Sequence, residues 1–286
     1  MEADCIPCLL GRVLYQTNLC APEKKGDVMM EVVRVLSHRY RPGVNSATTA
    51  TAVHRRAYDI IGCPDPYEDL KRRSNAVAES LLGRATEFVE SAEERLEAAC
   101  LVAIAGNVLD FGIGSAIRSP EMLVDGFESL IRQGLDVNEV PKMERILRGA
   151  RSVVYLVDNC GEIVLDKILV SEIKRYGARI VGVVKGDRIL TDATAEDAEA
   201  SSISALFDRM LDTGGFAVGI DLDIVGDDLI EELQGADLIV SKGMANFESL
   251  SDSGLRPIAY LLRAKCLPVA RTIGAARNDN VVRVYE

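Results

Sequence analysis

The side chains best suited to chemistry are Asp158 and Asn159, which follow directly after an apolar run at 153–157. A carboxylate beside an amide offers adjacent hard oxygen ligands, which suit a divalent cation such as magnesium or manganese. Asp and Asn also serve as turn residues and helix caps, and for this pair alone that structural role is an equal alternative. The apolar run predicts a buried strand that is followed by a helix. The pair would then lie at the carboxyl end of a strand, where ligands bind in open α/β sheets.

A third oxygen ligand, Asp192, follows the next predicted strand. Consecutive parallel strands are usually neighbours, so the two loops can converge on one ion. A metal site of Asp158, Asn159 and Asp192 is therefore feasible. Asp192 could instead cap the helix that contains 195–198. Two further carboxylates compete with it for the ligand role on sequence grounds, namely Asp187 and Asp197.

A cation beside a glycine, Lys242 and Gly243, follows a third predicted strand and should lie at the same edge of the sheet. Lys can bind phosphate as a point charge, and Gly lets backbone N–H groups approach an anion closely. The alternative is a surface turn with Lys242 in solvent. This is not a Walker phosphate loop, because the sequence has no Gly-x-x-x-x-Gly-Lys-Ser/Thr run.

Two more polar side chains, Asn107 and Asp110, come after the apolar segment 99–105. Polar groups beside so hydrophobic a segment must be solvated, paired or used by a ligand. Capping of the preceding helix would also account for them.

The cysteines indicate packing more than chemistry. Cys5 and Cys8 form a Cys-x-x-Cys pair, but no second pair or nearby pair of histidines completes a zinc site, so we favour helix packing for both. Cys160 as a nucleophile is poorly supported, because the two histidines lie far away in the sequence. Seven dispersed cysteines do not indicate a secreted disulfide framework, and we expect most of them to be reduced.

The composition is that of an ordinary globular protein, with 48% hydrophobic residues in a chain of 286. The formal net charge of −11 argues against a general nucleic-acid surface or an anionic-membrane surface. No apolar stretch approaches the roughly 18 residues of a spanning helix, and the acidic start lacks the basic segment of a signal peptide. We therefore expect a cytoplasmic protein with no nucleic-acid or membrane partner. The sequence assigns no oligomeric state.

The spacing of apolar residues divides the chain into two parts. Helical signals dominate the first part, at 5–19, 25–38, 46–61, 66–90 and 92–104. The second part alternates strands at 152–157, 178–184, 237–240, 257–262 and 267–270, with a weaker one at 216–220, and helices at 161–176 and 227–233. This alternation is typical of a doubly wound parallel sheet. We predict an α/β fold with a Rossmann-like, mainly parallel sheet at 150–286 and an N-terminal helical domain or cap at 1–149 that contributes to the pocket.

Together these residues resemble the DUF89 family, the damage-control phosphatases with an ARMT1-like metal-binding domain, in its prokaryotic type with an N-terminal Cys-x-x-Cys. The resemblance spans nearly the whole chain, and its motifs are specific in combination. They are Asp65-Pro66-Tyr67 with Lys71 and Asn75, Gly106-Asn107 with Asp110-Phe111-Gly112, Asp158-Asn159 with Gly161-Glu162, Thr191-Asp192-Ala193-Thr194, and Lys242-Gly243 with Asn246-Phe247-Glu248.

The resemblance implies a helical region packed on an α/β domain and hydrolysis of phosphorylated metabolites. It implies that a divalent metal is held by Asp158, Asn159 and Asp192. Lys242 would hold phosphate. The remaining implied substrate contacts are Asn107, Asp110, Asn246 and Glu248.

We therefore expect a metal-dependent phosphatase that acts on small phosphomonoesters, such as phosphosugars or damaged phosphometabolites. Its catalytic residues would be Asp158, Asp192 and Lys242, and its ion magnesium, manganese, cobalt or nickel. The ion and Lys242 would stabilise charge on the transferring phosphoryl group. Both attack by a water that the cation activates and attack by Asp158 to give an aspartyl phosphate are open.

Two other functions compete with this one. An S-adenosylmethionine-dependent methyltransferase could use the same kind of sheet, but the loop after the first strand, 158–162, is not the glycine-rich ligand loop that it would favour. A non-catalytic sensor of phosphorylated metabolites would retain the pocket and lack turnover.

Overall fold

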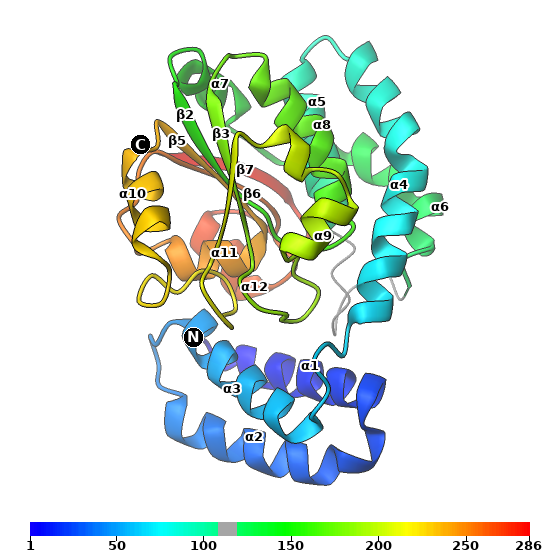
Figure 1. Ribbon diagram of the computed structural model, residues 1–286, viewed down its shortest axis with the longest axis vertical. Coiled ribbons are helices and arrows are strands. Elements are labelled where there is room, and N and C mark those ends of the chain that lie inside the picture. The colour runs from blue at the N-terminus through cyan, green and yellow to red at the C-terminus, as the bar shows by residue number, and fades with distance from the viewer. Residues whose placement is uncertain (108–118) are drawn as a thin grey trace.

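The central feature of the computed structural model, which describes residues 1–107 and 119–286, is a mainly parallel β-sheet. Within those residues the sheet has seven strands in the order β1-β7-β6-β5-β2-β3-β4 (Figure 1). Neighbouring strands are parallel except for β6 and β7. The predicted α/β fold class is confirmed. The strands are β1 Val137–Asn138, β2 Ser152–Leu156, β3 Arg179–Val184, β4 Arg209–Asp212, β5 Leu238–Lys242, β6 Ile258–Arg263 and β7 Asn280–Tyr285.

Helices cover both faces of the sheet, because its strands are apolar on both sides. In β2, Val153 and Tyr155 belong to one hydrophobic core, and Val154 and Leu156 belong to another. A strand buried on both faces has a nearly continuous apolar run, and this is why β2 was visible in the sequence. The first face carries α4 Glu68–Ser91, α5 Arg95–Gly106, α6 Met122–Gln133, α7 Val140–Leu147 and α8 Glu162–Lys174. The second carries α10 Asp227–Gly235, α11 Gly243–Leu250 and α12 Leu267–Ile273.

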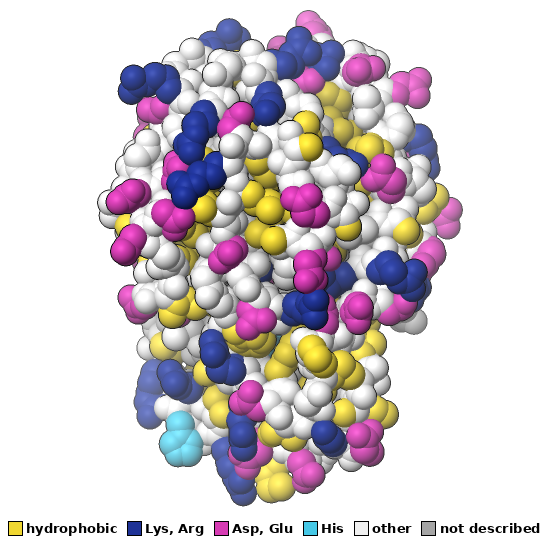
Figure 2. Space-filling model, viewed as in Figure 1, with side chains coloured by type: hydrophobic (Ala, Val, Ile, Leu, Met, Phe, Trp, Pro, Cys, Tyr) yellow, Lys and Arg dark blue, Asp and Glu magenta, His cyan; other side chains and the backbone are white. Residues whose placement is uncertain are grey.

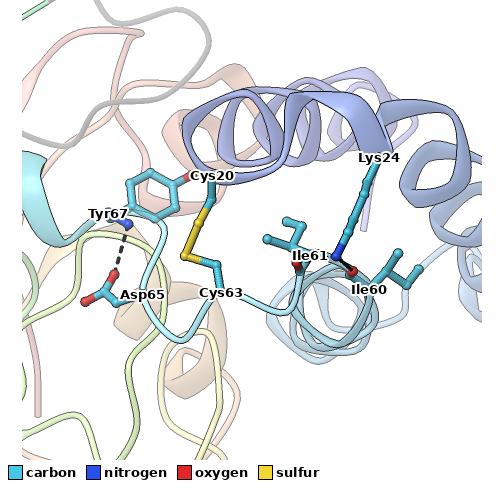
Figure 3. Close-up of a disulfide and its surroundings, with 7 residues drawn as sticks. All are labelled: Cys20, Lys24, Ile60, Ile61, Cys63, Asp65 and Tyr67. Atoms are coloured by element: carbon cyan, nitrogen blue, oxygen red, sulfur yellow. Dashed lines mark hydrogen bonds between the residues drawn. A yellow bond between two sulfur atoms is a disulfide. The ribbon is translucent and has the colours of Figure 1, made fainter.

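The first three helices form a separate bundle at the lower end of the molecule in Figure 1. They are α1 Cys5–Cys20, α2 Lys25–Arg39 and α3 Ser46–Ile61. The side chain of Asn45 accepts hydrogen bonds from the backbone N–H groups of Ala47 and Thr48 and so caps α3. A disulfide between Cys20 and Cys63 ties the end of α1 to the segment after α3 (Figure 3). The other five cysteines are free, as expected for most of the seven.

The packing of the hydrophobic cores divides the chain at an earlier position than the expected boundary between residues 149 and 150. Helices α4 to α7 share the core of the sheet, and β1 pairs with β7. The physical reason is α5, in which every residue from Ala98 to Gly106 is buried. A helix that is hydrophobic all round must be enclosed by other elements and cannot form a surface cap. The bundle that stands apart therefore ends at the Cys63 segment.

Two predicted strands are also wrong. The residues at 267–270 begin helix α12, where a proline occupies the first turn, a position that suits its fixed φ. The residues at 216–220 form no strand. The short strands β1 and β4 and the last strand β7 were not predicted from the sequence.

The described residues include no helix that is long and apolar enough to cross a membrane. On the face shown in Figure 2, acidic and basic side chains of the described residues are interspersed.

The order of the strands predicts a ligand-binding position at the carboxyl ends of β2 and β5, which we call the crevice. From β2 the chain proceeds to β3 and β4 on one side, and then returns to β5 on the other side of β2. In open α/β sheets such a reversal of direction leaves a crevice at the carboxyl ends of the two strands, and ligands bind there. Asp158 follows β2 and Gly243 follows β5, so both lie at this crevice.

Candidate functional site

Two loops lie side by side at the crevice because their backbones are hydrogen bonded. The N–H of Ala193 donates to the carbonyl of Asp158 at 2.9 Å, and the N–H of Cys160 donates to the carbonyl of Thr191 at 2.8 Å. Asn159 and Asp192 form an isolated antiparallel bridge. The structure therefore brings together the three side chains that the sequence suggested as metal ligands. All three are buried.

The carboxylate of Asp158 is held by two amide groups. Its Oδ2 accepts hydrogen bonds from Nδ2 of Asn107 at 2.9 Å and from Nδ2 of Asn159 at 2.6 Å. The same oxygen lies against Gly243 at the start of α11. Asp158 is therefore fixed from three sides by residues of three different segments.

The amide of Asn159 can present either of its ends to Asp158. Its Oδ1 accepts a hydrogen bond from Oγ1 of Thr191 at 2.6 Å. A hydroxyl both donates and accepts, and an amide can be turned over without changing its shape. The Thr191 hydroxyl could accept from the turned amide, and the Asn159 oxygen would then face Oδ2 of Asp158. Two such oxygens repel each other unless a cation lies between them, so the turned amide belongs to a metal-bound state.

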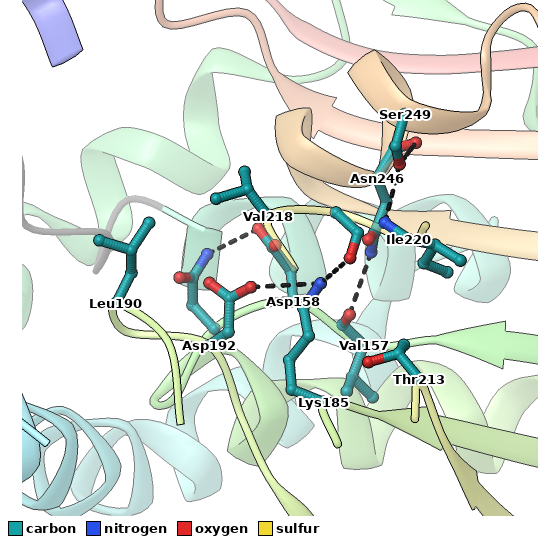
Figure 4. Close-up of polar contacts among 12 residues, drawn as sticks. Val157, Asp158, Lys185, Leu190, Asp192, Thr213, Val218, Ile220, Asn246 and Ser249 are labelled. Carbon is teal, nitrogen blue, oxygen red and sulfur yellow. Dashed lines mark hydrogen bonds and ion pairs between the residues drawn. The ribbon is translucent and has the colours of Figure 1, made fainter. Parts of the chain in front are cut away.

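A lysine that the sequence analysis missed, Lys185, lies beside Asp192. Its Nζ is 3.4 Å from Oδ2 of Asp192 and also donates to the carbonyl of Gly219 (Figure 4). Lys185 directly follows β3 and precedes Gly186. A Lys-Gly pair after a strand is the same signal that drew attention to Lys242 and Gly243, and it could have identified Lys185.

Lys242 itself does not occupy the position that the sequence suggested. Its side chain is fully buried at 0% exposure. The ammonium group donates to Glu162, to Oδ1 of Asp166 at 2.7 Å and to the carbonyl of Ala103 at 3.3 Å. Burial alone lowers the pKa of Lys242, but Asp166 and Glu162 outweigh it and hold the pKa above its usual range. This position does not suit a direct contact with a phosphoryl group.

The expected substrate contacts lie in three different surroundings. Asn107 is in contact with Asp158, as described above. Asn246 donates to the carbonyls of Val157 and Lys242 and so ties α11 to the end of β2. Glu248 accepts from the hydroxyl of Ser46 at 2.6 Å and therefore faces the bundle helix α3. Asp110 lies outside the described residues.

Helix α4 also reaches the site. Lys71 forms ion pairs with Asp65 at 3.3 Å and with Asp197 at 2.9 Å, and Asn75 accepts a hydrogen bond from the backbone N–H of Gly161. Burial lowers the pKa of Lys71, but the adjacent thiol and carboxylates raise it above its usual range. The face shared by Lys71 and Asn75 is thus a packed face that positions the loop after β2.

The donor set at the crevice suits a hard divalent cation. Among residues 1–107 and 119–286, no group of three or more His, Cys, Asp or Glu side chains could hold a metal ion. The candidate set at the crevice is not such a group, because only two of its members are carboxylates, Asp158 and Asp192, and the third is the amide Asn159. Magnesium is commonly held by one or two carboxylates, and waters and substrate phosphate complete its shell. Among the described residues, the buried Oδ1 of Asn107 has no hydrogen-bond partner.

A cavity of about 700 Å³ opens between the bundle and the loop after β3. The bundle contributes Arg55 and Tyr58 from α3, and the sheet contributes Lys185 and its neighbours. The hydroxyl of Tyr58 accepts from the N–H of Leu190 at 2.9 Å, so the loop is fixed against α3. Charged groups of both signs line the cavity, which favours a polar ligand. The other lining side chains include Asp59, Asp187, Arg188, Glu196, Asp212 and Phe216.

Comparisons with known proteins indicate the same family over nearly the whole chain. A family model for the damage-control phosphatase ARMT1-like domain matches residues 1–281. A damage-control phosphatase from Archaeoglobus fulgidus is 40% identical over 284 residues, which cover 99% of this chain and 98% of that protein. A damage-control phosphatase from Pyrococcus horikoshii is 27% identical over 276 residues, which cover 96% of this chain and 94% of that protein.

The similarity extends to a solved structure. The crystal structure of a DUF89 family protein from Pyrococcus horikoshii is similar to this chain with a TM-score of 0.89 and 26% sequence identity. The similarity covers 100% of this chain and 99% of that one.

Proposed function

The chain belongs to the damage-control phosphatase ARMT1-like family, and from this premise we propose that it is a metal-dependent hydrolase of small phosphomonoesters. The names of its relatives support a phosphatase role. The observation that carries the proposal is the convergence of Asp158, Asn159 and Asp192 at the crevice between β2 and β5, with the cation Lys185 beside Asp192.

The chain's own residues have distinct tasks in this proposal. Asp158, Asn159 and Asp192 hold the divalent ion, which supplies positive charge to the transferring phosphoryl group when it is bound. Lys185 takes the role first assigned to Lys242, because its Nζ lies beside Asp192 and the residue is part of the cavity lining. An ammonium aimed at the developing negative charge in a site shielded from water stabilises that charge strongly.

We favour water over Asp158 as the nucleophile. Oδ2 of Asp158 already accepts a hydrogen bond from Nδ2 of Asn107, and the packing against Gly243 leaves this oxygen little room to move. A nucleophilic carboxylate needs an oxygen that is free to approach phosphorus in line. Direct attack by water does not require Asp158 to move.

The cavity beside Lys185 suits the remainder of a small phosphorylated metabolite. Its walls carry guanidinium, carboxylate and phenol groups, which can exchange hydrogen bonds with hydroxyl groups. A phosphosugar or a similar polar phosphometabolite matches these walls better than an apolar alcohol. Ligand pockets of about 300–1,000 Å³ are usual for molecules of this size.

The test is phosphate release by metal-stripped protein to which magnesium, manganese, cobalt or nickel is restored separately. Substrates would be a panel of sugar phosphates and a generic aryl phosphate. We expect metal-dependent release that is lost in Asp158→Asn and kept in the matched surface variant Asp69→Asn. Asp69 is a suitable control because its side chain is 65% exposed. No release with any ion would contradict the proposal and favour a sensor, and S-adenosylmethionine binding without an ion would favour a methyltransferase.

A further inference from the structure

A continuous chain of buried polar side chains runs from the core to Asp158. It begins at Lys242 on β5, passes through Glu162 on α8 and continues through Asn107 at the end of α5. We call these three residues the polar relay. We propose that Lys242 is a positioning residue that acts on Asp158 through the polar relay and does not bind phosphate. This proposal rests on the proposed function, because it concerns the same metal site.

The first step is that Lys242 has no donor left for a ligand. An ammonium group has three N–H donors. In Lys242 they have three acceptors, which are Glu162, Asp166 and the carbonyl of Ala103. The side chain is also fully buried. A phosphoryl group would have to displace one of these partners and leave it unpaired in the core.

The second step is that Lys242 determines where Glu162 lies. The two oxygens of Glu162 are divided between partners, since Oε1 accepts from Lys242 and Oε2 accepts from Nδ2 of Asn107 at 2.7 Å. Glu162 is fully buried, and a buried carboxylate needs a counterion. Lys242 supplies it. Without Lys242, Glu162 and Asp166 would be two uncompensated carboxylates in the core.

The third step is that Glu162 determines which way Asn107 faces. The two hydrogens of the Asn107 amide are shared between Oε2 of Glu162 and Oδ2 of Asp158. If the amide were turned over, its oxygen would face two carboxylate oxygens and be repelled by both. Glu162 therefore holds the NH₂ group of Asn107 toward Asp158, and Asn107 in turn holds Oδ2 of Asp158.

The polar relay should affect the binding of the metal, and it should affect the substrate only through the metal. Groups that orient a metal ligand typically affect metal affinity or activity by about 10- to 100-fold. We expect a loss of this size for manganese when the polar relay is broken, because Asp158 then loses one of the groups that hold its Oδ2 in place. Phosphate affinity at saturating manganese should stay within about twofold of the wild-type value, since the relay does not contact substrate.

The test measures manganese binding alone by calorimetric titration of the folded, metal-stripped protein. Asn107→Leu removes the amide link with similar volume, Glu162→Gln removes the charge with the same shape, and Lys242→Met removes the cation. Each should bind manganese about 10- to 100-fold more weakly. The control is Lys167→Met, which removes a lysine of α8 whose partner is Glu79 and which is not part of the relay.

The outcomes separate this inference from the proposed function. Wild-type manganese affinity in Asn107→Leu would overturn the inference, even if the Lys242 variant failed to fold. Unchanged manganese affinity together with weaker phosphate binding in Lys242→Met would also overturn it and restore Lys242 as a phosphate contact. Unchanged manganese affinity in Asp158→Ala would overturn the proposed metal site itself.

Discussion

Gly243 packs directly against Asp158. A Cβ atom built at Gly243 would lie 1.8 Å from Oδ2 of Asp158, far closer than nonbonded atoms approach one another. The two residues come from the ends of β5 and β2, which are neighbours in the sheet. The contact therefore joins the two sides of the crevice at the proposed metal ligand. Only a glycine at 243 leaves room for the carboxylate where it lies.

The first prediction follows from this contact. Gly243→Ala should abolish metal-dependent phosphate release, because the new methyl group must displace Asp158. It should also lower the free energy of unfolding by about 1–3 kcal/mol, since residue 243 has a φ of +77° that a side chain tolerates poorly. Activity assays and chemical denaturation would measure the two effects.

A matched control separates the clash from the backbone strain. Gly177 has a φ of +82°, and nothing lies within 4 Å of a Cβ built there. Gly177→Ala should therefore lose stability but keep activity. Equal activity in the Gly177 and Gly243 variants would contradict the assigned role of the contact.

The second prediction concerns Lys185. Lys185→Met should lower kcat by about 10²- to 10³-fold, the loss typical when one donor to a developing charge is removed. Manganese binding should persist or become tighter, because an ammonium 3.4 Å from Asp192 competes with a metal cation. Lys185→Arg should retain part of the activity, since it keeps the charge. Unchanged steady-state kinetics in Lys185→Met would remove Lys185 from the site.

The positions of the two Lys-Gly pairs show which features of the site could be predicted from the sequence and which could not. Both pairs follow a strand, and both predict a cation at the edge of the sheet. Lys185 lies one residue beyond β3, whereas Lys242 is the last residue of β5 and is enclosed beneath α8. Adjacent strand residues point to opposite faces, so a shift of one residue decides whether a side chain reaches the crevice or the core. The pattern of apolar residues in a sequence does not locate the end of a strand to a single residue.

Other parts of the site were predictable for a physical reason. The strand before Asp158 is buried on both faces, so its continuous apolar run and sharp polar end were visible. The neighbouring placement of Asp192 followed from the rule that consecutive parallel strands lie side by side. The contact of Glu248 with Ser46 joins residues about 200 positions apart, and no local pattern encodes such a pairing.

The third prediction concerns pH. Burial lowers the pKa of His54 from 6.5 to about 3, with a smaller contribution from Arg12. The unfolded chain binds a proton at His54 below pH 6.5, and the folded protein does not. The stability from neutral His54 is therefore present above pH 6.5 and is lost as the pH falls toward 3, by up to about 1.4 kcal/mol per pH unit.

The variant His54→Asn tests this slope. Asparagine does not titrate, and its amide nitrogen can replace Nδ1 of His54, which lies 2.9 Å from Oε1 of Gln16. Denaturation curves at pH 7, 6 and 5 should show a smaller loss of stability in the variant than in the wild type. Parallel losses in the two proteins would show that His54 is not the group responsible.

The fourth prediction concerns the disulfide between Cys20 and Cys63. It closes a loop with a sequence separation of 43 residues, and such a link stabilises a fold by about 2–4 kcal/mol. A reducing agent should lower the Tm of the wild type. It should have no effect on the double variant Cys20→Ser, Cys63→Ser, whose Tm should equal that of the reduced wild type. A wild-type Tm that is insensitive to reduction would contradict this expectation.

The central claim is that Asp158, Asn159 and Asp192 form the metal centre at the crevice between β2 and β5. The most direct test is anomalous diffraction from crystals of the metal-stripped protein soaked in manganese. We predict an anomalous peak within coordinating distance of oxygen atoms of all three side chains, and no peak there in crystals of Asp158→Ala. A peak at another group of residues, with none at the crevice, would contradict the account.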